Sequence, residues 1–286
     1  MHVEEENEPV DYERGGILRE LIMLGTGSAM VTRCFNTCFL LKLEDGSLFL
    51  TDAGGGNTIL RQLELADVDY GRLHHMFVTH GHTDHVLGVI WVVRKVASLI
   101  SQGKYEGKLH IYCHDVVRNM LEVMAGLTLK KKDLGQLGVN ILLHEMTDGG
   151  KAEILGMELT AFDIHSTKAK QFGYLLQFSD GMRFCCLGDE PYQEMAESYA
   201  RNADWLLSEA FCRYGDRERF KPYEKNHSTV KEAGEAAEAL GVKHLVLYHT
   251  EDRDLQHRKE NYMEEAGKYY HGQVFVPDDL ERILLG

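Results

Sequence analysis

The segment 78–88, VTHGHTDHVLG, constrains the fold of this chain more than any other feature. Within six positions it contains four side chains that bind metals well, namely His80, His82, Asp84 and His85. It follows an apolar run typical of a strand and precedes a stretch whose apolar residues recur every three or four positions, as on one face of a helix. A turn between a strand and a helix can direct all four side chains inward. Because imidazole and carboxylate groups are natural ligands of zinc and similar divalent ions, the segment predicts a metal site.

Three further potential ligands stand at the ends of apolar runs elsewhere in the chain. His165 ends LTAFDIH, Asp189 ends MRFCCLGD and His249 ends HLVLYH. Taken alone, a histidine or aspartate at a strand end is more often structural. Together with the first cluster, these residues indicate strands whose ends meet at one site. Asp84 and His85 can serve a different ion from His80 and His82.

Strands, hairpins and helices alternate along the chain without repeats. Asp-Gly lies between apolar runs in both 38–54 and 172–189, which predicts two hairpins with type I′ turns. Further strands are predicted at 18–25, 75–79, 109–113, 205–210 and 244–249, and helices at 86–100, 115–126 and 228–241, the last with Ser228 as its N-cap. No linker divides the chain, so we predict one layered α/β domain over residues 17–286. Residues 1–16 are acidic and polar and are predicted to be a disordered lead-in.

Several short motifs resemble those of the metallo-β-lactamase superfamily and, within it, the ribonuclease Z-like branch. The pattern H-x-H-x-D-H is highly specific to the superfamily, and SEA followed by HST is more specific to the branch. The resemblance runs from about Leu18 to about His249. In the family's order, the motifs are MLGTGSA (23–29), TDAG (51–54), THGHTDH (79–85), His165, LGDE (187–190), SEA (208–210), HST (227–229) and LYHT (247–250).

The resemblance implies a four-layer αββα sandwich, in which helices cover two mixed sheets and a two-metal site lies on one edge. One ion would be bound by His80, His82 and His165, the other by Asp84, His85 and His249, and Asp189 would bridge both. Zinc is the expected ion, with manganese and iron as alternatives. Two such ions lower the pKa of a bridging water until hydroxide is available near neutral pH, and they neutralise a bound phosphate or carboxylate. Asp84 is assigned both to the ligands and to the catalytic residues.

His227 and Glu209 are predicted to act beside the metals rather than to bind them. His227 stands just before a predicted helix, where it could clamp a phosphate oxygen and protonate a leaving alkoxide. Glu209 could hold its imidazole in one tautomer. In the resembled family, the matching pair does this work on a phosphodiester. The resemblance also implies that Asp52 orients a ligand histidine. The alternative for His227 is a residue at a helix start with no catalytic role.

The formal net charge of −14 lowers the expectation of a large nucleic-acid partner, because most proteins that grip phosphates need a basic face. Many bacterial ribonuclease Z proteins carry a long tRNA-gripping arm between the positions that correspond here to His165 and Asp189. In this chain only the hairpin around Asp180-Gly181 fits there. The basic stretches 130–132 and 213–221 are expected to be solvated loops, although the second could line the site.

We therefore predict a dinuclear metal-dependent hydrolase that acts on a small phosphodiester. The main alternative is a ribonuclease Z-type endonuclease that cleaves the 3′ end of tRNA. An arylsulfatase, a lactonase and a non-catalytic binding protein are further alternatives. The acidic N-terminal segment has no signal-peptide pattern and no apolar run could span a membrane, so we expect a cytoplasmic protein. Related enzymes are commonly homodimers, and we expect the same here.

Overall fold

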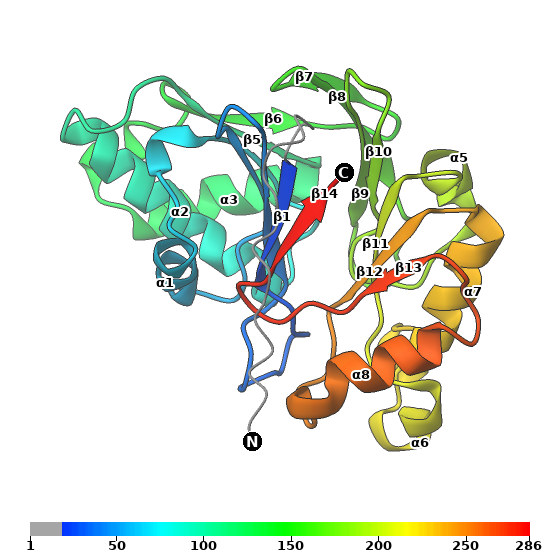
Figure 1. Ribbon diagram of the computed structural model, residues 1–286. Coiled ribbons are helices and arrows are strands. Elements are labelled where there is room, and N and C mark those ends of the chain that lie inside the picture. The colour runs from blue at the N-terminus through cyan, green and yellow to red at the C-terminus, as the bar shows by residue number, and fades with distance from the viewer. Residues whose placement is uncertain (1–18) are drawn as a thin grey trace, which may run out of the picture.

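Two mixed β-sheets face each other in the middle of the protein, as a computed structural model shows for residues 19–286 (Figure 1). The predicted lead-in at 1–16 lies outside the described residues. The first sheet has the strand order β14 (Arg282–Leu285), β1 (Arg19–Gly25), β2 (Cys38–Lys42), β3 (Leu48–Thr51), β4 (Leu73–Phe77), β5 (Leu109–Cys113) and β6 (Ile141–Glu145). The second has the order β13 (Gln273–Phe275), β12 (His244–Tyr248), β11 (Trp205–Glu209), β10 (Arg183–Cys186), β9 (Phe172–Gln177), β8 (Met157–Asp163) and β7 (Lys151–Ile154).

Helices cover the outer face of each sheet, which confirms the predicted four-layer αββα sandwich. The first sheet is covered by α1 (Thr58–Leu65), α2 (Thr83–Ser101) and α3 (Asp115–Thr128), with the short α4 (Lys131–Leu134) beside them. On the second sheet lie α5 (Glu197–Ala200), α7 (Val230–Leu240) and α8 (Leu255–Ala266), while α6 (Arg217–Phe220) lies below them in Figure 1. Three apolar layers result: one between the sheets and one under each set of helices.

Parallel pairing places several strand ends on one edge of the sandwich. In the first sheet β3, β4, β5 and β6 run parallel, and in the second β10, β11, β12 and β13 do. The carboxyl ends of parallel strands meet at the same edge, where the loops that follow them can share a site. The predicted ligands follow β4, β8, β10 and β12.

Two local predictions were wrong in detail. Both Asp-Gly hairpins form, but only Gly46 and Gly181 have positive φ, whereas a type I′ turn needs it at both central residues. Around Gly46 the loop is instead closed by the Asp45 carboxylate, which accepts a hydrogen bond from the Ser47 N–H at 2.8 Å. The N-cap of α7 is Thr229 rather than Ser228, because Thr229 forms a capping box with Glu232.

No helix among residues 19–286 is long and apolar enough to cross a membrane. All six cysteines are free thiols and five of them are buried, so the described fold contains no disulfide.

A second group of histidines lies on neighbouring strands, away from the predicted metal ligands. His75 on β4 is paired in register with His110 on β5, and their rings stack with centroids 5.1 Å apart. His110 Nδ1 lies 2.8 Å from Nε2 of His144 on β6. Burial, together with the neighbouring His110, lowers the pKa of His75 to about 4. Burial also lowers the pKa of His110 and of His144. Three neutral imidazoles are therefore part of the stable fold.

We expect the fold to lose stability as pH falls from about 6.5 towards 4. A histidine whose pKa is lower when folded takes up its proton more readily in the unfolded chain, so protonation favours unfolding across that window. The apparent melting temperature should be several degrees lower at pH 5 than at pH 7. In His110→Gln/His144→Gln this difference should be smaller. The exposed His271→Gln serves as the control. An unchanged pH dependence in the double variant would contradict a role for this group.

Candidate metal centre

The turn between β4 and α2 carries four of the predicted ligands. His80 follows β4 and is fully buried, and its backbone forms an isolated bridge with Gln171. His82 is the N-cap residue of α2, and Asp84 and His85 lie in its first turn, both buried. Because α2 begins inside the motif, Asp84 and His85 point in a different direction from His80 and His82.

The Asp189 carboxylate is the point on which these side chains converge. Its Oδ2 lies 3.6 Å from Nε2 of each of three imidazoles, those of His80, His85 and His249. His80 and His85 come from the turn after β4, Asp189 follows β10, and His249 follows β12. One carboxylate oxygen thus joins loops from both sheets.

Two groups of potential ligands share this corner of the protein. The first contains His80, His82 and Asp189, and the second contains Asp84, His85 and His249. Within each group one ligand atom per residue lies within 4.8 Å of the others. Such a spacing suits one divalent ion for each group.

Orphaned polar atoms indicate that the residues fit metal ions. His85 Nε2 and Asp189 Oδ1 are buried and have no hydrogen-bond partner. A buried polar atom without a partner is costly, and a bound cation would satisfy both. The burial of His249 lowers its pKa to about 3. Burial raises the pKa of Asp189, but the surrounding imidazoles outweigh it and hold the pKa well below its usual range. A neutral imidazole and a charged carboxylate are the forms that bind metal.

Hydrogen bonds to neighbouring residues fix the orientation of the rings. Asp52, which follows β3, places its Oδ2 2.7 Å from Nδ1 of His85. The same carboxylate accepts hydrogen bonds from the backbone N–H and the hydroxyl of Thr79. Thr37 Oγ1 lies 3.0 Å from Nδ1 of His249. In each case one ring nitrogen is engaged, which leaves Nε2 directed at the ligand groups.

The structure does not bring His165 into either group. It follows β8 with φ of +55° and is exposed, and its backbone N–H donates to Asp163 Oδ1 at 2.8 Å. Among the described residues, Asp189 takes the third place in the first group instead. The assignment of His165 as a ligand stays a prediction, and the metal content of His165→Ala would test it.

His227 and Glu209 lie together at one side of the ligand groups. Glu209 ends β11 and is fully buried, and its Oε2 lies 3.6 Å from Nδ1 of His227. Its Oε1 accepts a hydrogen bond from the Ser228 N–H. Burial raises the pKa of the Glu209 carboxyl, and His227 partly opposes this rise. One face of the His227 ring stacks on Phe211 with centroids 5.1 Å apart. The imidazole is thus held between a carboxylate and an aromatic ring.

A cavity of about 650 Å³ opens above the ligand groups. His82, Asp84, Asp189, His227 and His249 line it. Two lysines that no sequence pattern marks, Lys168 and Lys225, line it as well. Lys168 lies in the loop after β8 and Lys225 ends a single 3-10 turn, so no periodicity or spacing signals a role for either. Their ammonium groups make the wall of the cavity suitable for an anion.

Comparison with known proteins agrees with the geometry. Residues 19–269 match the model of a family described as "Anti-Pycsar protein Apyc1". Among curated relatives, ribonuclease Z of Thermococcus kodakarensis is 26% identical over 92% of this chain and 94% of its own length. Ribonuclease Z of Thermococcus sibiricus is 24% identical over 93% of this chain and 96% of its own.

Solved structures share the fold at low identity. The metallo-β-lactamase fold protein YhfI of Bacillus subtilis superposes with a TM-score of 0.74 at 20% identity, over 94% of this chain and all of its own. The short form of human tRNase Z gives 0.73 at 20% identity, over 92% of this chain and 98% of its own. A diphosphatase of the PhnP family gives 0.69 at 18% identity, over 94% and 98%.

We expect fully reconstituted protein to hold about two divalent ions per chain, one for each ligand group. Asp189→Ala should weaken the binding of both ions, because its carboxylate lies beside histidines of both ligand groups. His249→Ala should weaken mainly one. Metal analysis after dialysis would measure both effects, and a reconstituted protein that never exceeds one ion would show that Asp189 does not bridge.

Proposed function

We propose that this chain, which belongs to the family of the anti-Pycsar protein Apyc1, hydrolyses small phosphodiesters. It is a metal-dependent hydrolase of the metallo-β-lactamase superfamily and of its ribonuclease Z-like branch. The observation that carries this proposal is the placement of the His227–Glu209 pair beside the two ligand groups around Asp189. Phosphodiester hydrolysis needs charge neutralisation at phosphorus and a proton for the leaving oxygen, and these two parts supply one each.

Two bound divalent ions would supply Lewis acidity and an activated water in the cavity. The residues that would hold them are His80, His82 and Asp189 on one side and Asp84, His85 and His249 on the other. Asp52 would keep the His85 ring turned towards the site through its 2.7 Å contact.

His227 would deliver the proton to the leaving oxygen. Its Nδ1 faces Glu209, so Nε2 is left for the substrate. The buried Glu209 carboxylate favours the tautomer with the proton on Nδ1 and stabilises the imidazolium before the proton is transferred. Lys168 and Lys225 would hold the non-bridging oxygens of the phosphate.

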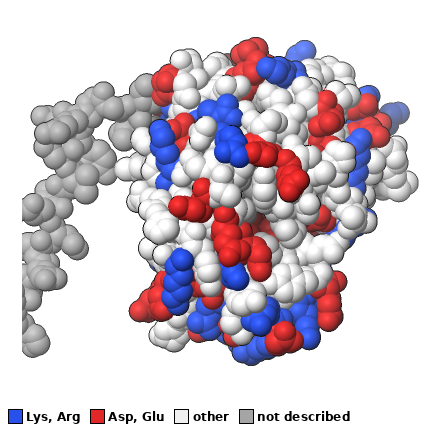
Figure 2. Space-filling view, turned by 90° about the vertical axis from the view of Figure 1, so that its right-hand side faces the viewer, with Lys and Arg blue, Asp and Glu red and all other residues white. Residues whose placement is uncertain are grey.

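The preference for a small substrate rests on the surroundings of the site. Between His165 and Asp189 the chain forms the short loop that carries Lys168, followed by β9, a tight turn and β10 of the second sheet, which leaves no long arm there. The net charge of −14 adds no general attraction for nucleic acid. On the face seen in Figure 2, Lys and Arg gather towards the lower end but are interspersed with Asp and Glu, and acidic residues occupy the middle.

The second candidate is cleavage of the tRNA 3′ end. It is favoured by the names of the curated relatives, which are ribonuclease Z enzymes aligned over most of both chains. The chemistry would be the same, and only the binding of the substrate body would differ.

We expect bis-p-nitrophenyl phosphate and cyclic nucleotides to be hydrolysed faster than a precursor tRNA is processed. A panel of these substrates with an aryl sulfate and a lactone, each with zinc or manganese, would rank the activities. Precursor tRNA should bind weakly at physiological salt, because the net charge of −14 repels the many phosphates that would lie outside the site. Efficient and correctly placed tRNA cleavage would instead establish the second candidate.

His227→Ala should slow hydrolysis of a diester with a poor alkoxide leaving group by roughly 10²–10⁴-fold, the usual contribution of positioned acid–base catalysis. With p-nitrophenolate as the leaving group little protonation is needed, so the loss should be much smaller. Steady-state rates on both substrates separate the acid role from phosphate clamping, which would affect both alike.

The metal content and circular dichroism of this variant serve as controls. Both should match the unsubstituted protein, because His227 belongs to neither ligand group. Equal losses on the two substrates would assign His227 to binding, and loss of an ion would make it a ligand.

A further inference from the structure

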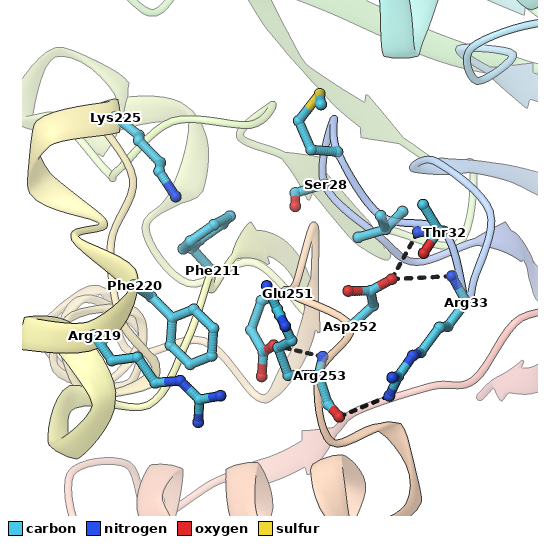
Figure 3. Close-up of a pocket in the computed structure, with 12 residues that line it drawn as sticks. Ser28, Thr32, Arg33, Phe211, Arg219, Phe220, Lys225, Glu251, Asp252 and Arg253 are labelled. Carbon is cyan, nitrogen blue, oxygen red and sulfur yellow. Dashed lines mark hydrogen bonds between the residues drawn. The ribbon is translucent and has the colours of Figure 1, made fainter.

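A second cavity of about 520 Å³ lies beside the candidate metal centre (Figure 3). Three segments far apart in the sequence form it: the loop after β1, the segment between β11 and α7, and the segment after β12. Lys225 lines both this cavity and the metal-centre cavity, and Ser28 here adjoins Ala29 there. The two cavities therefore share a boundary.

The cavity is rich in cations although the protein as a whole is acidic. Arg33, Arg219, Lys225 and Arg253 line it, and all four are exposed. Within residues 19–286 none of them forms an ion pair with a carboxylate. Figure 3 shows Lys225 and Arg219 on one side and Arg33 on the other.

The two carboxylates that line the cavity are engaged with the backbone. Asp252 Oδ2 accepts hydrogen bonds from the backbone N–H groups of Thr32 and Arg33. Glu251 Oε2 accepts one from the backbone N–H of Arg253. Four cations thus face two carboxylates, and the cavity has an excess of positive charge that would attract an anion.

The wall shared with the metal centre contains the partner of the proposed proton donor. Phe211 stacks on His227 and also lines the second cavity, where Lys225 lies 4.5 Å from the centre of its ring. Phe220 meets Phe211 edge-on. The cavity therefore lies next to His227, the residue that would protonate the leaving oxygen.

We propose that this cavity binds the leaving-group part of the substrate and selects a leaving group that carries its own terminal phosphate. The inference rests on the proposed phosphodiesterase function. A terminal phosphate would pair with Arg219 and Arg253, and guanidinium groups bind phosphate through parallel hydrogen bonds. The aromatic edge of Phe220 would face an organic ring between the two phosphates.

The dinucleotide pApA and the dinucleoside monophosphate ApA test the proposal, because they differ only by a terminal phosphate. Water would attack the bridging phosphorus, the P–O3′ bond would break, and His227 would protonate the released 3′-oxygen. The products would be two molecules of 5′-AMP from pApA and adenosine with 5′-AMP from ApA, so only in pApA does the leaving nucleoside carry its own phosphate. We expect kcat/KM for pApA to exceed that for ApA by at least about tenfold at low salt, and the preference to shrink as salt rises. Arg219→Ala/Arg253→Ala should bring the ratio close to one. Lys132→Ala removes an exposed cation on α4, outside both cavities, and should leave the ratio unchanged.

Inorganic phosphate, titrated during hydrolysis of bis-p-nitrophenyl phosphate, separates a phosphate carried by the substrate from a free one. If free phosphate alters that rate through Arg219 and Arg253 while pApA and ApA react equally, the cavity is an effector site and the proposal is wrong.

Equal rates for the two dinucleotides, or no reaction with either by protein that hydrolyses bis-p-nitrophenyl phosphate, would overturn the leaving-group inference alone. Inactivity on every phosphodiester would overturn the proposed function and this inference with it.

Discussion

The contact of one carboxylate oxygen with three imidazoles organises the active corner of this protein. Asp189 Oδ2 lies at the same 3.6 Å from His80, His85 and His249, so loops from both sheets are tied to a single atom. The carboxylate and rings are buried, and in that environment an unpaired charge is expensive. The geometry is therefore best understood as a site completed by cations, and the surrounding strands hold it in place.

The backbone accepts strain to build this corner. Asp52 and His249 both have positive φ, a conformation that side chains other than glycine rarely adopt. Each follows a buried strand and turns its side chain from the strand direction into the site. Gly88 on α2 allows a further close approach, because a Cβ there would lie 1.8 Å from the Ala53 carbonyl oxygen. The loop after β3 and the first turn of α2 can therefore meet closely enough for Asp52 to reach His85.

Much of this arrangement could be predicted from the sequence, because its signals are local. The H-x-H-x-D-H turn and the predicted ligands Asp189 and His249 at strand ends depend on short patterns, and the structure brings all of them together. His165 could be marked by the same pattern, but its final orientation depends on loop contacts such as that with Asp163. The N-cap of α7 is Thr229 rather than the predicted Ser228, and this difference likewise reflects a tertiary contact. The backbone N–H of Ser228 donates to the Glu209 carboxylate. No pattern in the sequence marks the cations of the second cavity, because they come from three segments that are far apart in the chain.

The path of the chain has a consequence for biosynthesis. The strands of the first sheet come from residues 19–145 except β14, which pairs with β1 and is translated after every other described strand (Figure 1). Until β14 emerges from the ribosome, β1 presents an apolar strand with a bare edge, the kind of surface that recruits other chains. Likewise, no intermediate that lacks β12 can assemble the complete set of ligands. The complete set of predicted ligands therefore forms only after most of the described strands have been translated, and β1 is exposed to other chains until β14 pairs with it.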